Sequence, residues 1–275
     1  MDTDGYIPPS ALTACREARM QGHAIYICSG RPCAIINERI LSIGFDGVIS
    51  SGGAHIEIGN TAKDLPFHGE VIFDVVMDTD IAKRISSFFS ERRCGFSLEK
   101  NYEVFSNRFL LDYLEDCRKQ FIGTPKEASY GELIGKIKRR PLIEDLGDDV
   151  YINVNKVVFT GSPDMRFSDV TERFSRDGEI FRGSIKYFGN ESGEISPAGI
   201  NKGSGLKAIA DYHGLTLEST IAIGDSDNDS PMIKCAGMGI AMGNADDELK
   251  AIAGYVTTPL REDGIFNAFK KCGII

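Results

Sequence analysis

TIAIGDSDND, residues 220–229, joins a short apolar run to a dense acidic loop. The apolar run predicts a buried strand of a parallel sheet, and Gly224 lets the backbone turn sharply after it. Three aspartates and Asn228 then crowd into the loop. Because closely packed carboxylates repel one another, a cation is expected among them. Oxygen ligands at the carboxyl end of a strand favour Mg²⁺ together with a phosphate. The alternative is a solvated acidic loop.

Composition limits the class of protein. The chain has 275 residues, 42% of them hydrophobic and 26% charged, with a formal net charge of −9. This length suits one large domain or two smaller ones. No basic run is dense enough for a nucleic-acid footprint, and we interpret residues 136–140 (KIKRR) as a solvated helix end. No apolar stretch reaches membrane-spanning length, and no secretory signal is present.

The cysteines and histidines show no ligand spacing. Seven cysteines are scattered without a CxxC pair, which favours reduced thiols in a cytoplasm over a disulfide framework or a zinc site. The four histidines are dispersed, and we interpret them as structural or surface residues. The sequence gives no oligomeric state.

Both ends of the chain alternate strands with helices. Near the N-terminus the pattern predicts a helix over 10–22 capped by Ser10, a strand over 24–28, a helix over 34–43 and a strand over 47–50. After residue 200 it predicts helices over 202–212, 230–235, 246–253 and 264–271, and strands over 220–223, 238–242 and 255–257. This alternation predicts an α/β fold with one doubly wound, Rossmann-like parallel sheet.

The middle of the chain has an α+β pattern. Helices are predicted over 79–92, 109–120 and 166–176, and strands over 96–98, 103–106, 156–160, 180–182 and 185–188. Gly193–Pro197 is expected to lead back into the core strands. We therefore predict a discontinuous core domain, residues 1–78 and 187–275, with an inserted cap domain, residues 79–186.

Two further segments could bind phosphate. Ser29 and Gly30 follow a strand, so a hydroxyl and free backbone N–H groups lie at its carboxyl end. The alternative for this segment is an ordinary helix N-cap. Lys202 opens a helix between glycines, and such a lysine is either a surface charge or a buried partner for phosphate.

Together these segments resemble the haloacid-dehalogenase-like (HAD) phosphohydrolases, in the Cof-type sugar-phosphatase branch with a large α/β cap. The matching text is IPPSALTACREARMQGHAIYICSGRP (7–32), DGVISSGGAHI (46–56), EISPAGINKGSGLKAI (194–209), GDSDNDSPMIKCAGMGIAMGNA (224–245) and YVTTPLREDGIFNAF (255–269). The resemblance implies a Mg²⁺-dependent phosphatase of small phosphorylated metabolites, such as sugar phosphates, that works through an aspartyl-phosphate intermediate.

The resemblance also implies roles for individual residues. Ser29, with Gly30, would bind phosphate, Lys202 would be the catalytic cation, and Asn228 would contact the phosphoryl group. The metal site would comprise Asp225 and Asp229, the latter supporting either Lys202 or the metal shell.

The nucleophile is where the sequence departs from the family. There, a hydrophobic strand in the middle of the sheet ends in D-x-D-G-T. Asp2 and Asp4 have a similar spacing, but no strand precedes them and Tyr6 replaces the threonine. The register of residues 7–32 places the family nucleophile before Met1 and residues 2–5 in a linker. We therefore expect the central strand and the nucleophile to be absent, leaving its neighbours without backbone partners.

Several functions remain open at this point. The register of residues 7–32 favours a truncated or inactive phosphatase. One alternative is a non-catalytic protein that binds a phosphorylated ligand, and another is an active enzyme using Asp2 or Asp4 as a shifted motif. A phosphomutase is a further, less favoured reading.

Overall fold

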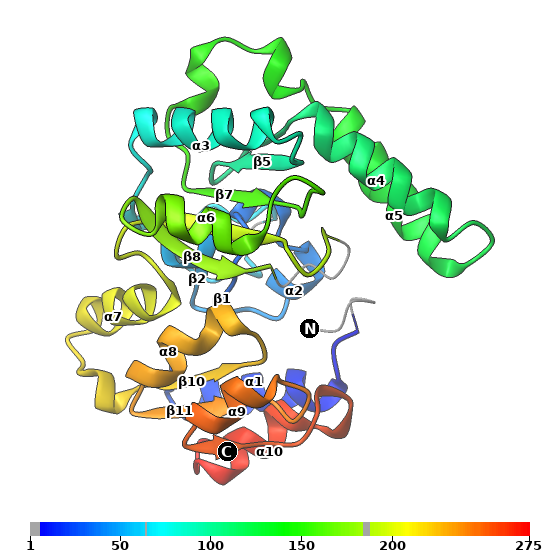
Figure 1. Cartoon of the computed structure of the whole chain (residues 1–275). Helices are drawn as coiled ribbons and strands as arrows, with labels where there is room; N and C mark the ends of the chain where they lie inside the picture. The colour runs from blue at the N-terminus through cyan, green and yellow to red at the C-terminus, as the bar shows by residue number, and fades with distance from the viewer. Residues whose placement is uncertain (1–5, 64, 184–187) are drawn as a thin grey trace. The chain divides into compact units, whose positions relative to one another are not determined.

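The computed structural model describes residues 6–63, 65–183 and 188–275. The chain divides into two compact units, which Figure 1 shows by residue number. Unit 1 comprises Met1–Asp74 and Ile200–Ile275, and unit 2 comprises Val75–Gly199. Strand β9 (Gly193–Pro197) pairs with strands of unit 2, so the expectation that this segment belongs with the core strands is wrong. Because β9 completes the sheet of the insert, the insert extends beyond the predicted boundary at residue 187.

Unit 1 contains short strands separated by helices. Its α-helices are α1 (Pro9–Met20), α2 (Glu38–Leu41), α7 (Lys202–Tyr212), α8 (Ser230–Cys235), α9 (Asp247–Ile252) and α10 (Gly264–Lys271). Its strands are β1 (Tyr26–Cys28), β2 (Gly47–Ser50), β3 (His55–Ile58), β4 (Glu70–Asp74), β10 (Ile221–Gly224), β11 (Met238–Ala241) and β12 (Tyr255–Val256). The α/β class is confirmed, and α7, α8 and α10 have the predicted bounds.

The strands of unit 1 form two sheets. One has the order β1-β2-β3-β4 and the other β10-β11-β12. The pairs β1–β2, β10–β11 and β11–β12 are parallel, whereas β3 and β4 extend the first sheet in antiparallel fashion. Among the described residues, β1 and β10 are therefore edges. In the part of the chain that the structure describes, the single parallel sheet predicted from the sequence is divided between these two edges.

Local contacts explain why the first helix begins at a different residue from the one predicted. α1 begins at Pro9, with Pro8 as its N-cap, because proline is pre-organised for a first helical turn. Ser10, predicted as the cap, instead donates a hydrogen bond to Asp263 Oδ1 at 2.5 Å. The predicted helix over 34–43 is shorter: a 3₁₀ turn, Cys33–Ile35, precedes α2.

Unit 2 has one antiparallel sheet. Its strands are β5 (Phe96–Glu99), β6 (Val104–Ser106), β7 (Lys156–Phe159), β8 (Gly178–Arg182) and β9, in the order β6-β5-β7-β9-β8. Its α-helices are α3 (Thr79–Glu91), α4 (Arg108–Gln120), α5 (Pro125–Lys138) and α6 (Phe167–Phe174). The predicted hairpin of β5 and β6 is confirmed. Most of the predicted strand over 185–188 lies outside the described residues.

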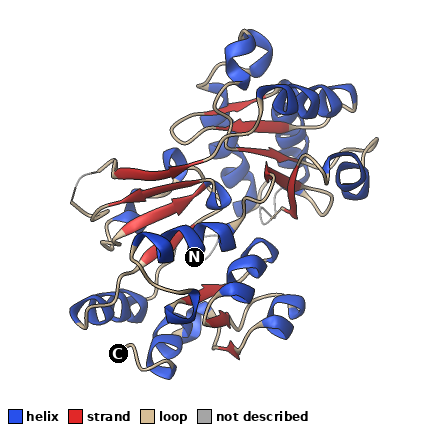
Figure 2. Ribbon diagram, turned by 90° about the vertical axis from the view of Figure 1, so that its left-hand side faces the viewer, coloured by secondary structure: helices blue, strands red, loops and turns tan. Residues whose placement is uncertain are grey.

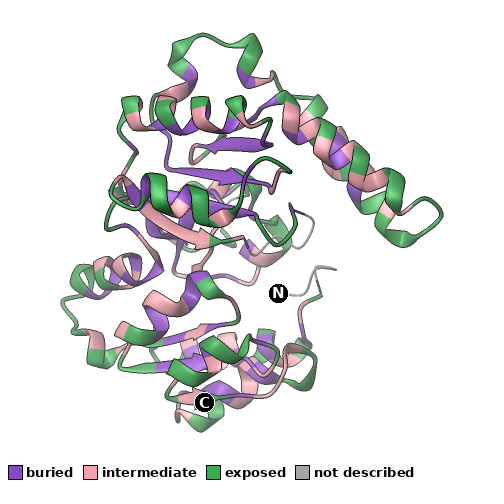
Figure 3. Cartoon of the chain, in the orientation of Figure 1, coloured by how far each residue is buried: buried purple, intermediate pink, exposed green. Residues whose placement is uncertain are grey.

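The core of unit 2 is aromatic. Phe89 of α3 stacks on Phe159 of β7 with ring centroids 4.8 Å apart, and Phe96 and Phe174 are buried in the same cluster. Figure 3 shows β5 and β7 as buried strands. Leu110 and Leu114 of α4 pack on α5, which the sequence reading did not predict. The end of α5 at Lys138 confirms that residues 136–140 close a helix.

Figure 2 shows the helices and the three groups of strands by secondary structure. Each helix in the described part of the chain is too short or too polar to cross a lipid bilayer. All seven cysteines are described, and none forms a disulfide.

Candidate active site

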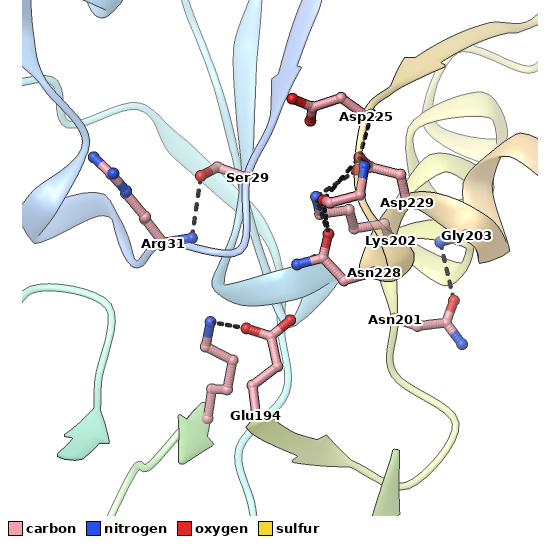
Figure 4. A network of polar contacts seen from close by, with 11 residues as sticks. Ser29, Arg31, Glu194, Asn201, Lys202, Gly203, Asp225, Asn228 and Asp229 are labelled. Atoms are coloured by element: carbon pink, nitrogen blue, oxygen red, sulfur yellow. Dashed lines mark hydrogen bonds and ion pairs between the residues drawn. The ribbon is translucent and has the colours of Figure 1, made fainter. Parts of the chain in front are cut away.

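Lys202 is a buried cation at the start of α7. Asn201 caps this helix, and its side chain accepts hydrogen bonds from Gly203 N at 2.9 Å and Ser204 N at 3.1 Å. The Lys202 ammonium donates to Asn228 Oδ1 at 2.9 Å and to Asp229 Oδ1 at 2.5 Å (Figure 4). Because the Lys202 residue is only 6% exposed, the surface-charge interpretation is wrong.

Asp229 organises the loop after β10. Its Oδ2 accepts hydrogen bonds from Asp225 N at 2.8 Å and from Ser226 N at 3.0 Å. A Cβ at Gly224 would overlap the side chain of Asp229, so only glycine lets the carboxylate fold back over the strand end. One oxygen of Asp229 thus orients Lys202 and the other closes the loop. This geometry favours the supporting role predicted for Asp229 over direct metal ligation.

Asp225 is the carboxylate that this loop leaves available. The residue is exposed, and within the described chain its side chain makes no hydrogen bond or ion pair. Figure 4 shows it beside the Lys202–Asp229 pair. Mg²⁺ uses one or two carboxylates and takes its other ligands from water and phosphate. Asp225 offers one available carboxylate, and the nearby Lys202 ammonium could hold a phosphate that supplies further oxygen ligands. These donors therefore fit the coordination that Mg²⁺ prefers.

Ser29 lies in the turn after β1. Its hydroxyl accepts a hydrogen bond from Arg31 N at 3.1 Å, and its own N–H donates to Ile49 O at 2.8 Å. Among the described residues, no hydrogen bond joins the Ser29 side chain to Lys202 or Asp225. The neighbouring Cys28 interacts electrostatically with the site. Burial raises the pKa of its thiol to about 12, the charge of Lys202 lowers this pKa and the charge of Asp229 raises it. The end of β1 therefore lies close to the Lys202–Asp229 pair.

The loop after β2 was not identified as functional from the sequence. Ser51 and Gly52 have positive φ angles of 50° and 69°, and the Ser51 hydroxyl is buried without a hydrogen-bond partner in the described structure. A Cβ at Gly53 would overlap the Asn201 carbonyl, so this loop packs tightly against the start of α7. The only sequence feature that could have indicated this tight loop is the run Ser51-Gly52-Gly53.

A second polar cluster lies on β3. Among the described residues, only Cys33, His55 and Glu57 bring three potential metal-ligand atoms close together. His55 Nε2 lies 2.9 Å from Glu57 Oε1, Cys33 Sγ lies 3.2 Å from the same oxygen, and Gly69 N donates to Glu57 Oε2 at 2.7 Å. Because these contacts already satisfy the carboxylate, we interpret the cluster as a structural network, as predicted for the histidines.

Asp2 and Asp4, the alternative nucleophiles, lie outside the described residues. In the described part of unit 1, the structure brings Lys202, Asn228 and Asp229 into direct contact. Asp225 shares their loop, and the turn at Ser29 and Gly30 ends the strand nearby (Figure 4).

Unit 2 carries a buried charged group of its own. Lys156 Nζ lies 2.8 Å from Glu194 Oε2 and 3.3 Å from Glu99 Oε2, on neighbouring strands. Burial lowers the pKa of Lys156, but the two glutamates outweigh it and the net shift is upward. Lys156 is therefore held as a cation by the sheet of unit 2.

Comparisons with known proteins show the family to which the chain is similar. The family model for haloacid dehalogenase-like hydrolases matches residues 1–269. YkrA, a phosphatase candidate of Bacillus subtilis (strain 168), is 27% identical over 278 residues, which cover 100% of this chain and 94% of YkrA. The phosphoglycolate phosphatase of Methanosarcina acetivorans is 46% identical over 76 residues, but these cover only 28% of this chain and 34% of that protein.

Two solved structures share the fold. BT1666 from Bacteroides thetaiotaomicron has a TM-score of 0.75 at 23% identity, covering 100% of this chain and 91% of its own. The HAD subclass IIB sugar phosphatase BT4131 has a TM-score of 0.76 at 24% identity, covering 100% of this chain and 95% of its own.

Proposed function

Because the chain belongs to the haloacid dehalogenase-like hydrolase family, we propose that unit 1 carries a Mg²⁺-dependent phosphatase site for small phosphorylated metabolites, sugar phosphates in particular. The observation that carries the proposal is the buried Lys202 ammonium, oriented by Asn228 and Asp229. A fixed cation beside the available Asp225 carboxylate suits a phosphoryl group bound between lysine and metal.

In this proposal each residue of the site has its own role. Lys202 attracts the phosphoryl oxygens, and Ser29 with Gly30 donates hydrogen bonds to them. Asn228 orients the phosphoryl group, and Asp229 keeps Lys202 in place. Asp225 would hold Mg²⁺, which when bound neutralises phosphoryl charge that would otherwise repel an attacking anion.

The proposed reaction has two steps. A carboxylate oxygen bonds to phosphorus while the ester P–O bond breaks, and the leaving oxygen takes a proton. Water then cleaves the resulting acyl phosphate and releases inorganic phosphate. Asp2 or Asp4 is one proposed source of that carboxylate.

Turnover of p-nitrophenyl phosphate tests this function. The assay compares the chain with and without Mg²⁺, and then Lys202→Met with Lys207→Met. Lys207 lies on the same helix in an exposed pair with Asp211, so it is a matched control. If Asp2 or Asp4 supplies the carboxylate, turnover depends on Mg²⁺, is lost in K202M and is kept in K207M. If the nucleophile is absent, as the register of residues 7–32 predicts, the chain shows no turnover. Loss in Asp2→Asn or Asp4→Asn would identify the attacking residue, and equal activity of both lysine variants would refute the role of Lys202.

The pre-formed contacts of the Lys202 ammonium also favour a second function. Lys202, Asn228 and Asp229 are already in contact, so the site could bind a phosphorylated ligand without catalysis. Calorimetry distinguishes the two functions: Mg²⁺-dependent phosphate binding without turnover supports the binding protein. We also propose a cytoplasmic location, on the basis of the seven free thiols.

A further inference from the structure

Cys33, His55 and Glu57 bring a thiol, an imidazole and a carboxylate together in unit 1. One ligand atom of each residue lies within 4.8 Å of the other two. His55 and Glu57 are two residues apart on β3, so their side chains project from the same face of the strand. Cys33 begins the 3₁₀ turn after β1, which is distant from β3 in the sequence. No ligand spacing therefore indicates this cluster in the sequence.

The distances within the cluster are close to those of a tetrahedral zinc site. Glu57 Oε1 lies 2.9 Å from His55 Nε2 and 3.2 Å from Cys33 Sγ. Zn–N and Zn–O bonds of ~2.0–2.2 Å and a Zn–S bond of ~2.3 Å separate tetrahedral ligands by about 3.3–3.6 Å. Side-chain shifts of about 0.5 Å at these two contacts would therefore make room for the ion.

Two neighbouring groups orient these ligands. Asp74 Oδ1 lies 3.2 Å from His55 Nδ1, and the two residues are paired between β3 and β4. A carboxylate that accepts a hydrogen bond from Nδ1 is the usual support of a metal-ligating histidine, because it directs the lone pair of Nε2 towards the metal. Gly69 N donates to the other oxygen of Glu57 at 2.7 Å. The ligands are thus held in place by groups that do not bind the ion.

The charge balance of the cluster also suits a divalent cation. The side chains of His55 and Glu57 are only 2% and 0% exposed. Carboxylates at both ring nitrogens favour an imidazolium, and the Cys33 thiol lies within hydrogen-bond distance of Glu57. One Zn²⁺ replaces the thiol proton and the Nε2 proton, and both protons go to solvent. Zinc binding therefore buries no additional net charge, and the hydrogen-bonded network is the metal-free form of the same cluster.

We propose that Cys33, His55 and Glu57 form a Zn²⁺ site. The thiolate sulfur, the imidazole Nε2 and a carboxylate oxygen supply three ligands, and water takes the fourth position. This mixed set suits Zn²⁺ better than Mg²⁺, which prefers oxygen ligands. The site shares no residue with the group around Lys202. The bound ion joins the turn after β1 to β3, so it stabilises unit 1.

Zinc binding by the full chain tests the proposal. Competition with a chromophoric chelator should give one Zn²⁺ per chain, and the Tm should rise with zinc concentration. Co²⁺ in place of Zn²⁺ should give the absorption of a thiolate-bound, tetrahedral cobalt ion. Alkylation followed by mass spectrometry should show that zinc slows modification of Cys33 but not of Cys272, which is also partly buried. This last measurement needs no variant.

Three variants give a matched comparison, and circular dichroism checks that each one folds. Cys33→Ser should remove the thiolate absorption and weaken zinc binding by about 100-fold or more, since a ligand contributes more than a supporting residue. Cys272→Ser should retain both. Asp74→Asn should weaken zinc binding by about 10–100-fold and retain the thiolate absorption, because Asp74 positions His55 without binding the ion.

Four results would overturn the proposal. They are equal or absent zinc protection at Cys33 and Cys272, a thiolate absorption that survives in C33S, and equal zinc affinities of C33S and the unmodified chain. The fourth is loss of zinc binding in Asp225→Asn, which would assign the ion to the loop after β10. All measurements omit phosphate and Mg²⁺, so their failure leaves the phosphatase proposal standing.

Discussion

The ammonium of Lys202 lies 2.5 Å from Oδ1 of Asp229, and both side chains are almost fully buried. The two residues come from a helix start and a strand-end loop, so their contact fixes one element against the other. A buried ion pair adds little net stability, because both charges lose water. Its removal on one side is costly, since the other charge is left buried. The pair is therefore best understood as a positioning device.

Lys202→Met is expected to lower the free energy of unfolding by about 3–5 kcal/mol, because Asp229 would remain buried and unpaired. Urea unfolding measures this. Lys207→Met should change it by about 0.5 kcal/mol or less, since its pair is exposed. The double variant K202M/D229N should lose less than the sum of the single losses. Additive losses would show that the two groups are not coupled.

Gly224→Ala is expected to displace Asp229, because the new Cβ would overlap its side chain. We expect lower stability and weaker phosphate binding together, by thermal unfolding and calorimetry. Gly135→Ala is the control: Gly135 lies in α5 with open space around it, so alanine should stabilise by about 0.5–1 kcal/mol. Unchanged phosphate binding in G224A would contradict the proposed role of the loop.

His55 should make stability depend on pH. Burial lowers its pKa, but hydrogen bonds with Glu57 and Asp74 outweigh this and the net shift is upward. The folded state therefore holds the proton more tightly. This contribution is complete below the unfolded pKa of about 6.5 and is lost as pH rises through the folded pKa. The loss in unfolding free energy caused by His55→Gln should thus be larger at pH ~5.5 than at pH ~8.5.

Chemical denaturation at the two pH values measures this difference. His23→Gln is the comparison, because His23 is exposed. A His55→Gln loss that is the same at both pH values would show that protonation of His55 does not stabilise the fold.

Lys156→Met should destabilise unit 2 by about 3–5 kcal/mol, since it removes the buried ammonium that lies between Glu99 and Glu194. Hydrogen exchange on β5, β7 and β9 measures the effect where it arises. Lys119→Met removes only an exposed pair with Asp116 and should be nearly neutral. Restoration of slow exchange by adding Glu194→Gln would support the electrostatic cause, and no rescue would oppose it.

The sequence was most informative where local chemistry decides the structure. The helix over 202–212 and the strand over 47–50 were predicted with their observed bounds. In the structure Asn201 caps the helix, and all four residues of the strand are buried. The acidic loop was also placed correctly at the end of a strand. The burial of Lys202 was weighed but not settled, because it depends on Asp229, which is distant in the sequence.

Other features depend on tertiary pairing. Gly193–Pro197 follows the insert in a pattern that a core strand could also have, and only its pairing with β7 and β8 assigns it to unit 2. β3 and β4 pair antiparallel with a β-bulge, which an alternating strand–helix pattern does not predict. α5 packs through Tyr130 and Ile134 on α4, while most of its residues are polar or small.

Calorimetric titration of inorganic phosphate in the presence of Mg²⁺ tests the central claim, that the residues around Lys202 bind a phosphoryl group with a metal. The comparison is between the unmodified chain, Asp225→Asn and Asp227→Asn, both exposed positions of one loop. We predict Mg²⁺-dependent binding that weakens by about tenfold or more in D225N and is kept in D227N. Absence of phosphate binding, or equal affinities in the two variants, would contradict the account.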